Sequence, residues 1–331
     1  MSANTTFAGI LTMARHEFRL RLRAGRWRWV LGAWFVVLAL LLVMLRISLL
    51  NSGAEDVGTP MLGGLMLLVL SLALLVVPSL TAQSVNGDRE RGVLATLQTT
   101  LLSPLEIALG KLLAAWGKAL VFLLVTLPLV AWCMLEGGVA IGRVAIALLV
   151  VALLLGVVCA VSQCLSALLA RSTTSAVLSY VFVFAMTVGT LVVFALSVAA
   201  TTESQEVRQR RYTYTAEIAH PERVWWLLAP NPFVILADAA PRVEPELNRR
   251  GRPERTSFDP LGAMGDAVRE TREGGQGDAF ASIAPGDREP GGPVWPYGLA
   301  FNVALGVGAV ALTERRLRTP YRSLPRAVRV A

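Results

Sequence analysis

The sequence predicts an all-α protein that crosses a membrane with six helices. Hydrophobic residues make up 54% of the chain and charged residues 16%, and the mean hydropathy is +0.57. A soluble domain has about 25% charged residues, and about 20 apolar residues suffice for one helix to cross a bilayer. Backbone groups in lipid must pair within their own segment, so apolar stretches of this length form helices. A soluble core of several buried helices is disfavoured by these lengths. The six predicted spans are residues 30–50, 61–82, 112–135, 144–170, 174–200 and 297–313.

The first 29 residues form a basic leader with six Arg against one acid, Glu17. Its apolar residues recur at helical spacing, which predicts an amphipathic helix lying along the cytoplasmic interface. A plain basic anchor without a further role is the alternative. The apolar positions are Phe7, Ile10, Leu11, Ala14 and Phe18.

Charge orients the predicted spans. Residues 314–331 carry six Arg against one acid, and basic residues near spans stay on the cytoplasmic side. We therefore expect both termini in the cytoplasm, a multi-pass protein of the cytoplasmic membrane, and a basic C-terminal tail. The net charge of +8 then reflects orientation and contact with the lipid bilayer, and no nucleic-acid binding is expected. Arg46 and Arg143 lie near predicted outer ends and are expected to reach the interface.

The loop 83–111 connects the second and third spans on the cytoplasmic side. A charged island, residues 86–92, is followed by leucines at helical spacing, which a polar loop does not require. This pattern predicts a short helix that docks on a partner outside the membrane. A solvated loop whose leucines rest on the membrane surface is the alternative. The leucines are Leu94, Leu97, Leu101, Leu102 and Leu105.

Residues 201–296 form a long outer segment before the last span. Residues 224–240 are apolar but too short to span, and Pro230 and Pro232 interrupt them. Because proline blocks a continuous helix, we expect short re-entrant helices that dip into the outer leaflet. Residues 241–293 are rich in Gly, Pro and charge, and such a long loop is expected to be disordered or a functional flap.

Polar groups within the spans are few. Lys118 is expected to snorkel to the inner interface, with a substrate contact as the alternative. Two stripes of small residues, Ala152-Gly156-Ala160 and Ala300-Ala304-Gly308, are suited to close helix contact. Polar residues at such depths more often join helices than bind cargo. Those considered are Ser162, Gln163, Ser166, Thr187, Thr190 and Asn302.

No catalytic constellation is recognisable. The two histidines, His16 and His220, fall on opposite sides of the membrane in this topology, so neither a triad nor a metal site is expected. Gly110-Lys111 does not belong to a phosphate-binding loop, because positions 105 and 112 are both Leu. We expect no catalytic, metal-binding or cofactor-binding residues in this chain. If ATP drives it, another chain hydrolyses the ATP.

Two neighbouring stretches resemble a known family. They are Gly87-Asp88-Arg89-Glu90-Arg91-Gly92-Val93-Leu94-Ala95-Thr96-Leu97 and Ser103-Pro104-Leu105-Glu106-Ile107-Ala108-Leu109-Gly110-Lys111. Together they resemble the segment between the second and third spans in the permease subunit of type-2 ATP-binding-cassette (ABC) exporters. Six spans, an interfacial N-terminal helix and short outer helices before the last span are also similar to that family.

The resemblance implies a subunit of a transporter that exports a hydrophobic or amphipathic substrate. Two permeases, a second copy or a sibling chain, would form the pathway, and cytoplasmic ABC ATPase subunits would carry ATP and Mg²⁺. The loop 83–111 would then hold a coupling helix that receives the movement of the ATPase. The implied coupling residues are Asp88, Arg89, Glu90, Arg91, Leu94, Leu97, Ser103 and Pro104, with Arg89, Glu90 and Arg91 making polar contacts and Leu94 and Leu97 packing.

Two other functions remain possible from the sequence. A non-transporting membrane scaffold or sensor would act through the outer segment 201–296. An intramembrane enzyme is the weakest of the three, because no acid, base or metal cluster lies at membrane depth. The expected organisation is 1–29 interfacial helix, 30–200 spans one to five with the loop 83–111, 201–296 outer segment, 297–313 span six and 314–331 cytoplasmic tail.

Overall fold

Within the residues that it describes, the computed structural model contains six helices that are long and apolar enough to cross a membrane, as in a multi-pass membrane protein. It describes residues 9–15, 26–52, 57–90, 92, 103–209, 212–240, 259–273 and 292–318. Each predicted span overlaps one of the six helices, and most of the helices run several residues past the apolar stretch. The helices are α2 (Arg26–Asn51), α3 (Gly58–Thr81), α6 (Pro104–Leu135), α7 (Ile141–Leu168), the continuous set α8 (Ser172–Phe184), η1 (Ala185–Gly189) and α9 (Thr190–Ala200), and α12 (Trp295–Arg318).

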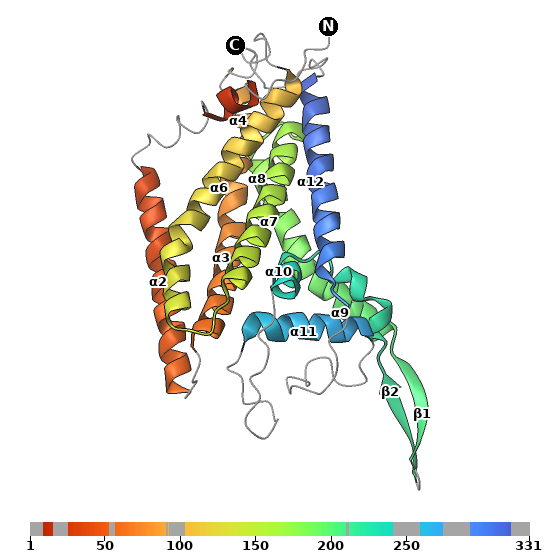
Figure 1. The fold of residues 1–331 in the computed structure, drawn as a ribbon. Coiled ribbons are helices and arrows are strands. Elements are labelled where there is room, and N and C mark those ends of the chain that lie inside the picture. The colour runs from red at the N-terminus through yellow and green to blue at the C-terminus, as the bar shows by residue number, and fades with distance from the viewer. Residues whose placement is uncertain are drawn as a thin grey trace.

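The long helices run side by side, and the short elements gather at the two ends of the bundle (Figure 1). The short helix α4 (Asn86–Glu90) lies at one end, which we call the α4 end. Helix α11 (Pro260–Glu273) lies across the opposite end, which we call the α11 end. Helix α7 is central, because it packs against α3, α6, α8 and α12. The main apolar core is formed largely by α2, α3, α6 and α7.

Of the two predicted stripes of small residues, one packs closely against a neighbouring helix and the other does not. Gly156 meets Trp116 of α6, whose indole nitrogen donates to the Ala152 carbonyl at 2.8 Å, so close contact at the first stripe is confirmed. Gly308 of the second stripe has no described atom within 4 Å of an added Cβ. The buried face of α12 instead includes Gly306 and Asn302. Apolar residues occur on every face of this helix, so the sequence does not indicate which face packs against the bundle.

The outer segment is more ordered than the sequence predicts. Two short 3₁₀ helices, η2 (Pro221–Arg223) and η3 (Trp225–Leu227), and α10 (Pro232–Ala239) flank the break at Pro230, as the expected short helices do. Helix α11 (Pro260–Glu273) corrects the prediction of disorder for this part of residues 241–293, whereas 241–258 and 274–291 lie outside the described residues. Its Leu261, Gly265 and Val268 are buried with helical spacing, so one face of it packs on the bundle.

A β-hairpin is the second departure, because an all-α fold was predicted. Strand β1 (Glu203–Gln209) pairs antiparallel with β2 (Tyr212–Ile218), in a register that places Glu203 opposite Ile218 and Gln209 opposite Tyr212. The hairpin projects from the α11 end beyond α9 (Figure 1).

Two arginines expected at the outer interface are paired with carboxylates instead. Arg46 donates to Glu136 at 2.7 Å between Nε and Oε1. The hydrogen bonds from Arg46 and then from Trp132 lower the pKa of the Glu136 carboxyl below its usual value. Arg143 is buried and pairs with Asp259. The outer segment folds back over the helix ends and supplies this second carboxylate, which corrects the expectation for Arg143.

A buried aspartate ties the outer elements together. Asp238 of α10 accepts from the backbone nitrogens of Val294 at 2.6 Å and Trp295 at 2.7 Å, where α12 begins. The same carboxylate pairs with Arg269 of α11. Because the first backbone N–H groups of a helix lack partners within it, Asp238 takes the place of an N-cap for α12. One side chain therefore joins α10, α11 and α12.

Candidate functional site

A short helix, α4, lies where the sequence predicts a docking helix, directly after α3. The rest of the predicted docking segment, up to residue 102, lies largely outside the described residues. A helix of five residues does not hold its shape alone, because helix nucleation is costly. Its start is fixed by Ser166 of α7, whose hydroxyl oxygen accepts from the backbone nitrogens of Val85 and Asn86, both at 3.1 Å. Ser166 and Asn86 are fully buried. The attachment to α7 is therefore shielded from solvent.

An ion pair on the buried side of α4 joins this helix to α6. The Asp88 carboxylate pairs with the Lys111 ammonium, and Lys111 also donates to the Ser84 carbonyl at 3.1 Å. Lys111 is 2% exposed. A buried ammonium needs a compensating charge and hydrogen bonds, and Asp88 and Ser84 supply both. Asp88 therefore faces into the bundle.

The remaining charged residues of α4 point in different directions. The Arg89 guanidinium is half-buried and donates to the Asn86 side-chain oxygen at 3.2 Å and to the Leu169 carbonyl at 3.3 Å. Arg89 thereby binds the backbone carbonyl of the residue that caps the end of α7. Glu90 is exposed at the end of α4. Of the described charges on α4, Glu90 is thus the one most open to contact from outside the bundle.

Ser103 and Pro104 begin α6 through a capping box. The Ser103 hydroxyl accepts from the Glu106 backbone nitrogen at 3.2 Å, and the Glu106 carboxylate accepts from the Ser103 backbone nitrogen at 2.7 Å. This reciprocal pair satisfies two backbone donors that have no partner within the helix. Pro104 suits the first helical position, because it lacks the N–H that would be unpaired there. These residues fix where α6 starts beside α4.

Two further elements converge at the α4 end. Residues 9–15 are helical, and Gly110 leaves so little space that an added Cβ would lie 2.7 Å from the Cβ of Met13. The N-terminal helix thus packs on α6 through Met13, whereas Leu11 on the predicted apolar face is exposed. A small buried cluster joins α6, α7 and the end of α12 with the turn before α4. Its members are Val85, Ile107, Ala108, Ala167 and Leu317.

The predicted coupling residues divide into three groups. Asp88 and Arg89 attach α4 to α6 and to the end of α7, whereas Ser103 and Pro104 begin α6. Glu90 is exposed. Arg91, Leu94 and Leu97 lie outside the described residues, as do Phe7 and Phe18 of the predicted N-terminal helix.

Sequence reasoning missed two residues that build this site. Ser166 was expected to join spanning helices, and Lys111 was considered only in a possible phosphate-binding loop and in the resemblance to type-2 exporters. Lys118 lies about two turns along the same face of α6 and is buried, so it does not snorkel to the interface as expected.

Of the other polar residues in the spans, Gln163 joins two spanning helices as predicted, whereas Asn302 and Thr190 bind the turn before α10. Gln163 of α7 donates to the Ala108 carbonyl of α6 at 2.8 Å. Asn302 of α12 donates to the Pro230 carbonyl of the outer segment at 3.0 Å. Thr190 accepts a hydrogen bond from Asn231 at 2.9 Å. The same Asn231 amide donates to the backbone carbonyl of Thr187.

The described contacts at the α4 end attach helices to one another. Over the described ranges, no group of three or more His, Cys, Asp and Glu residues is arranged to hold a metal ion. The charges at the α4 end are instead paired across helices, which suits a rigid contact surface. Comparison of the chain with models of protein families and with curated proteins finds no match.

Proposed function

We propose that this chain is the permease subunit of an ABC exporter and that a separate ATPase docks on α4. The observation that carries the proposal is the attachment of α4 by buried bonds to two spanning helices. Asp88 joins it to α6 through Lys111, and Ser166 joins it to α7. Supporting this is the resemblance of residues 87–111 to the loop of type-2 exporters, together with six helices of spanning length.

The buried attachment of α4 determines how a force applied to this helix reaches the spanning helices. Packed elements move as rigid bodies and do not deform continuously. A force applied at exposed Glu90 would pass through α4 into α6 and α7, because the bonds that hold α4 are buried. In this proposal the α4 end and both termini are cytoplasmic. A second permease, either a copy or a sibling chain, would complete a pathway for a hydrophobic or amphipathic substrate.

The alternative is a membrane scaffold or sensor that acts through the outer segment. The layer of α10 and α11, which Asp238 and Arg269 tie to α12, favours this second function. The two proposals differ in which end of the bundle matters. A transporter depends on α4, whereas a sensor depends on the α11 end and is indifferent to Glu90.

The test is co-purification in mild detergent, with mass spectrometry and an ATPase assay of the purified material. We expect wild-type protein to retain an ATPase and the double variant Glu90→Ala with Arg91→Ala to retain roughly tenfold less, as is typical when contact residues at the centre of an interface are truncated. Glu273→Ala is the matched control, because Glu273 is also an exposed carboxylate but lies on α11. Wild-type protein free of ATPase, or equal recovery from all three proteins, would refute the proposal.

A further inference from the structure

Span five changes its helical type near its middle. Residues Ala185–Gly189 (η1) form a π-helical turn between α8 and α9. Such turns are rare and are frequent at functional sites. None of the described side chains of η1 or α9 is buried within this chain. The part of span five beyond the π turn is therefore weakly packed here, and segments with few buried contacts open most easily.

Asn231 makes the principal polar attachment of this part of span five. It is fully buried, and its amide nitrogen donates to the Thr187 carbonyl at 2.8 Å and to the Thr190 hydroxyl at 2.9 Å. Its side-chain oxygen accepts from the Phe233 backbone nitrogen at 2.9 Å, which caps α10. One side chain thus links the π turn to the start of α10.

The other side of this link is firmly joined to α12. Asn302 donates to the Pro230 carbonyl at 3.0 Å and to the Gly298 carbonyl at 2.9 Å. Gly298 lies so close to the turn that an added Cβ would be 1.9 Å from the Ala229 carbonyl oxygen. The turn over residues 228–231 and α12 therefore form one body, to which Asn231 fastens span five.

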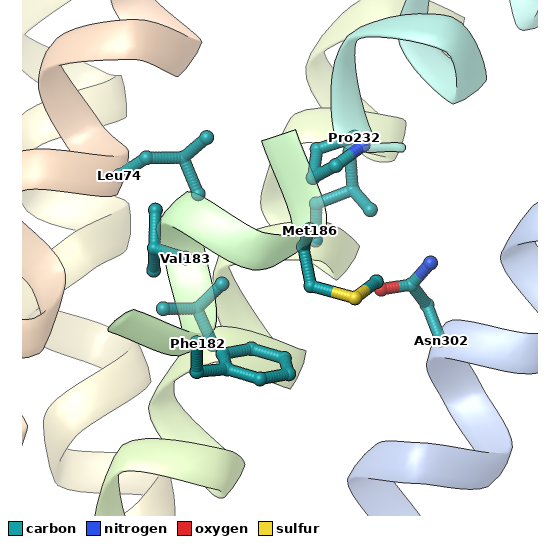
Figure 2. Close-up of a pocket in the computed structure, with 8 residues that line it drawn as sticks. Leu74, Phe182, Val183, Met186, Pro232 and Asn302 are labelled. Atoms are coloured by element: carbon teal, nitrogen blue, oxygen red, sulfur yellow. The ribbon is translucent and has the colours of Figure 1, made fainter. Parts of the chain in front are cut away.

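A small hollow lies beside this link (Figure 2). Met186 of the π turn extends toward Asn302. Pro232, the first residue of α10, also lines the hollow. Its free volume of about 10 Å³ is close to the space that one water molecule needs. Atoms that border a void lose dispersion contacts, so the residues that line the hollow are packed less tightly than they would be in a filled site. The lining residues are Leu74, Leu154, Val158, Phe182, Val183, Met186, Pro232 and Asn302.

We infer that Asn231 is a releasable latch, and that its release lets α9 hinge at the π turn and open the α11 end of the bundle. Both bonds of the latch are neutral hydrogen bonds to oxygens of span five, so a rearrangement breaks them without separating charges. The groups set free are polar and need new partners. The opened state therefore admits water between α9 and the turn. This inference does not depend on an ATPase partner.

Hydrogen exchange of the full chain in lipid nanodiscs, followed by mass spectrometry, tests the latch. Each hydrogen bond between membrane helices shifts an equilibrium by roughly threefold on average. We expect Asn231→Ala to accelerate exchange of the α9 amides roughly tenfold, and Thr190→Val, which removes one of the two bonds, roughly threefold. Thr59→Val is the control, because it removes a single 3.0 Å hydrogen bond to the Gly138 carbonyl at the same end and leaves span five untouched.

Thr190→Val decides the outcome if Asn231→Ala fails to fold, because Thr190→Val leaves the cap on α10 intact. Faster exchange confined to α9 in Thr190→Val, with α7 unchanged and with the control like wild type, supports the latch. Exchange of α9 equal to wild type in Thr190→Val overturns it, as does an equal acceleration in Thr59→Val. The measurement uses the chain without any ATPase, so its failure leaves the proposed transport function untouched.

Discussion

Asp88→Ala is expected to destabilise the protein strongly and to release α4 from α6. The substitution leaves the Lys111 ammonium, which is 2% exposed, without its carboxylate partner. Removing one member of a buried ion pair costs about 3–5 kcal/mol, because the remaining charge is left uncompensated. We expect a loss of several degrees in the midpoint of thermal unfolding in detergent and a matching loss of ATPase coupling.

A double variant separates the charge effect from a general defect. Asp88→Asn combined with Lys111→Met removes both charges, and replacing a buried pair by neutral groups of similar size is often tolerated. We expect the double variant to recover most of the thermal midpoint that the single change loses. A single variant as stable as wild type, or a double variant no better than the single one, would contradict the role given to this pair.

Asp238→Ala is expected to loosen the whole α11 end. The change removes the acceptor for the Val294 and Trp295 backbone nitrogens and takes the carboxylate away from Arg269. The bond from Arg269 to the backbone carbonyl of residue 238 can remain. The Arg269 side chain is partly exposed, so we place the cost near the lower end of the range for buried pairs, about 3 kcal/mol. The measurements are the thermal midpoint and hydrogen exchange over the first turn of α12, which should both change.

The matched control for Asp238→Ala is a substitution in an exposed ion pair of the same outer segment. Glu203 accepts from Arg223 at 2.8 Å, and both side chains are half exposed. Exposed pairs contribute little, because water screens them. Glu203→Gln should therefore leave the thermal midpoint unchanged. Equal losses from Asp238→Ala and Glu203→Gln would show that the buried tie has no special role.

The spans were predictable because the length of an apolar stretch is a local property of the sequence. Helix α6 begins at Pro104, before its predicted span, because the capping box at Ser103 and Glu106 starts a helix among charged residues. Helix α11 was missed because its Gly, Pro and charged neighbours dominate the composition of the region. The buried spacing of Leu261, Gly265 and Val268 was a readable signal within it.

The pairing of charges could not be predicted, because it depends on how the helices pack. Asp88 and Lys111 are 23 residues apart, and Arg143 and Asp259 are 116 apart. Nothing in the sequence indicates which acid meets which base. Asp88 and Arg89 make contacts within the bundle, Glu90 is exposed, and Arg91 lies outside the described residues. The contact of these charges with a partner stays a prediction.

The most direct test of the central claim asks what touches position 90 in the cell membrane. A photoreactive amino acid in place of Glu90 should form an adduct with a soluble ATPase, recognised by mass spectrometry from its phosphate-binding loop. The same amino acid in place of Leu135, which is 86% exposed near the opposite end, should not form that adduct. Adduct formation only from position 90 is the predicted result. No nucleotide-binding protein captured at position 90, or the same one captured at both positions, would contradict the account.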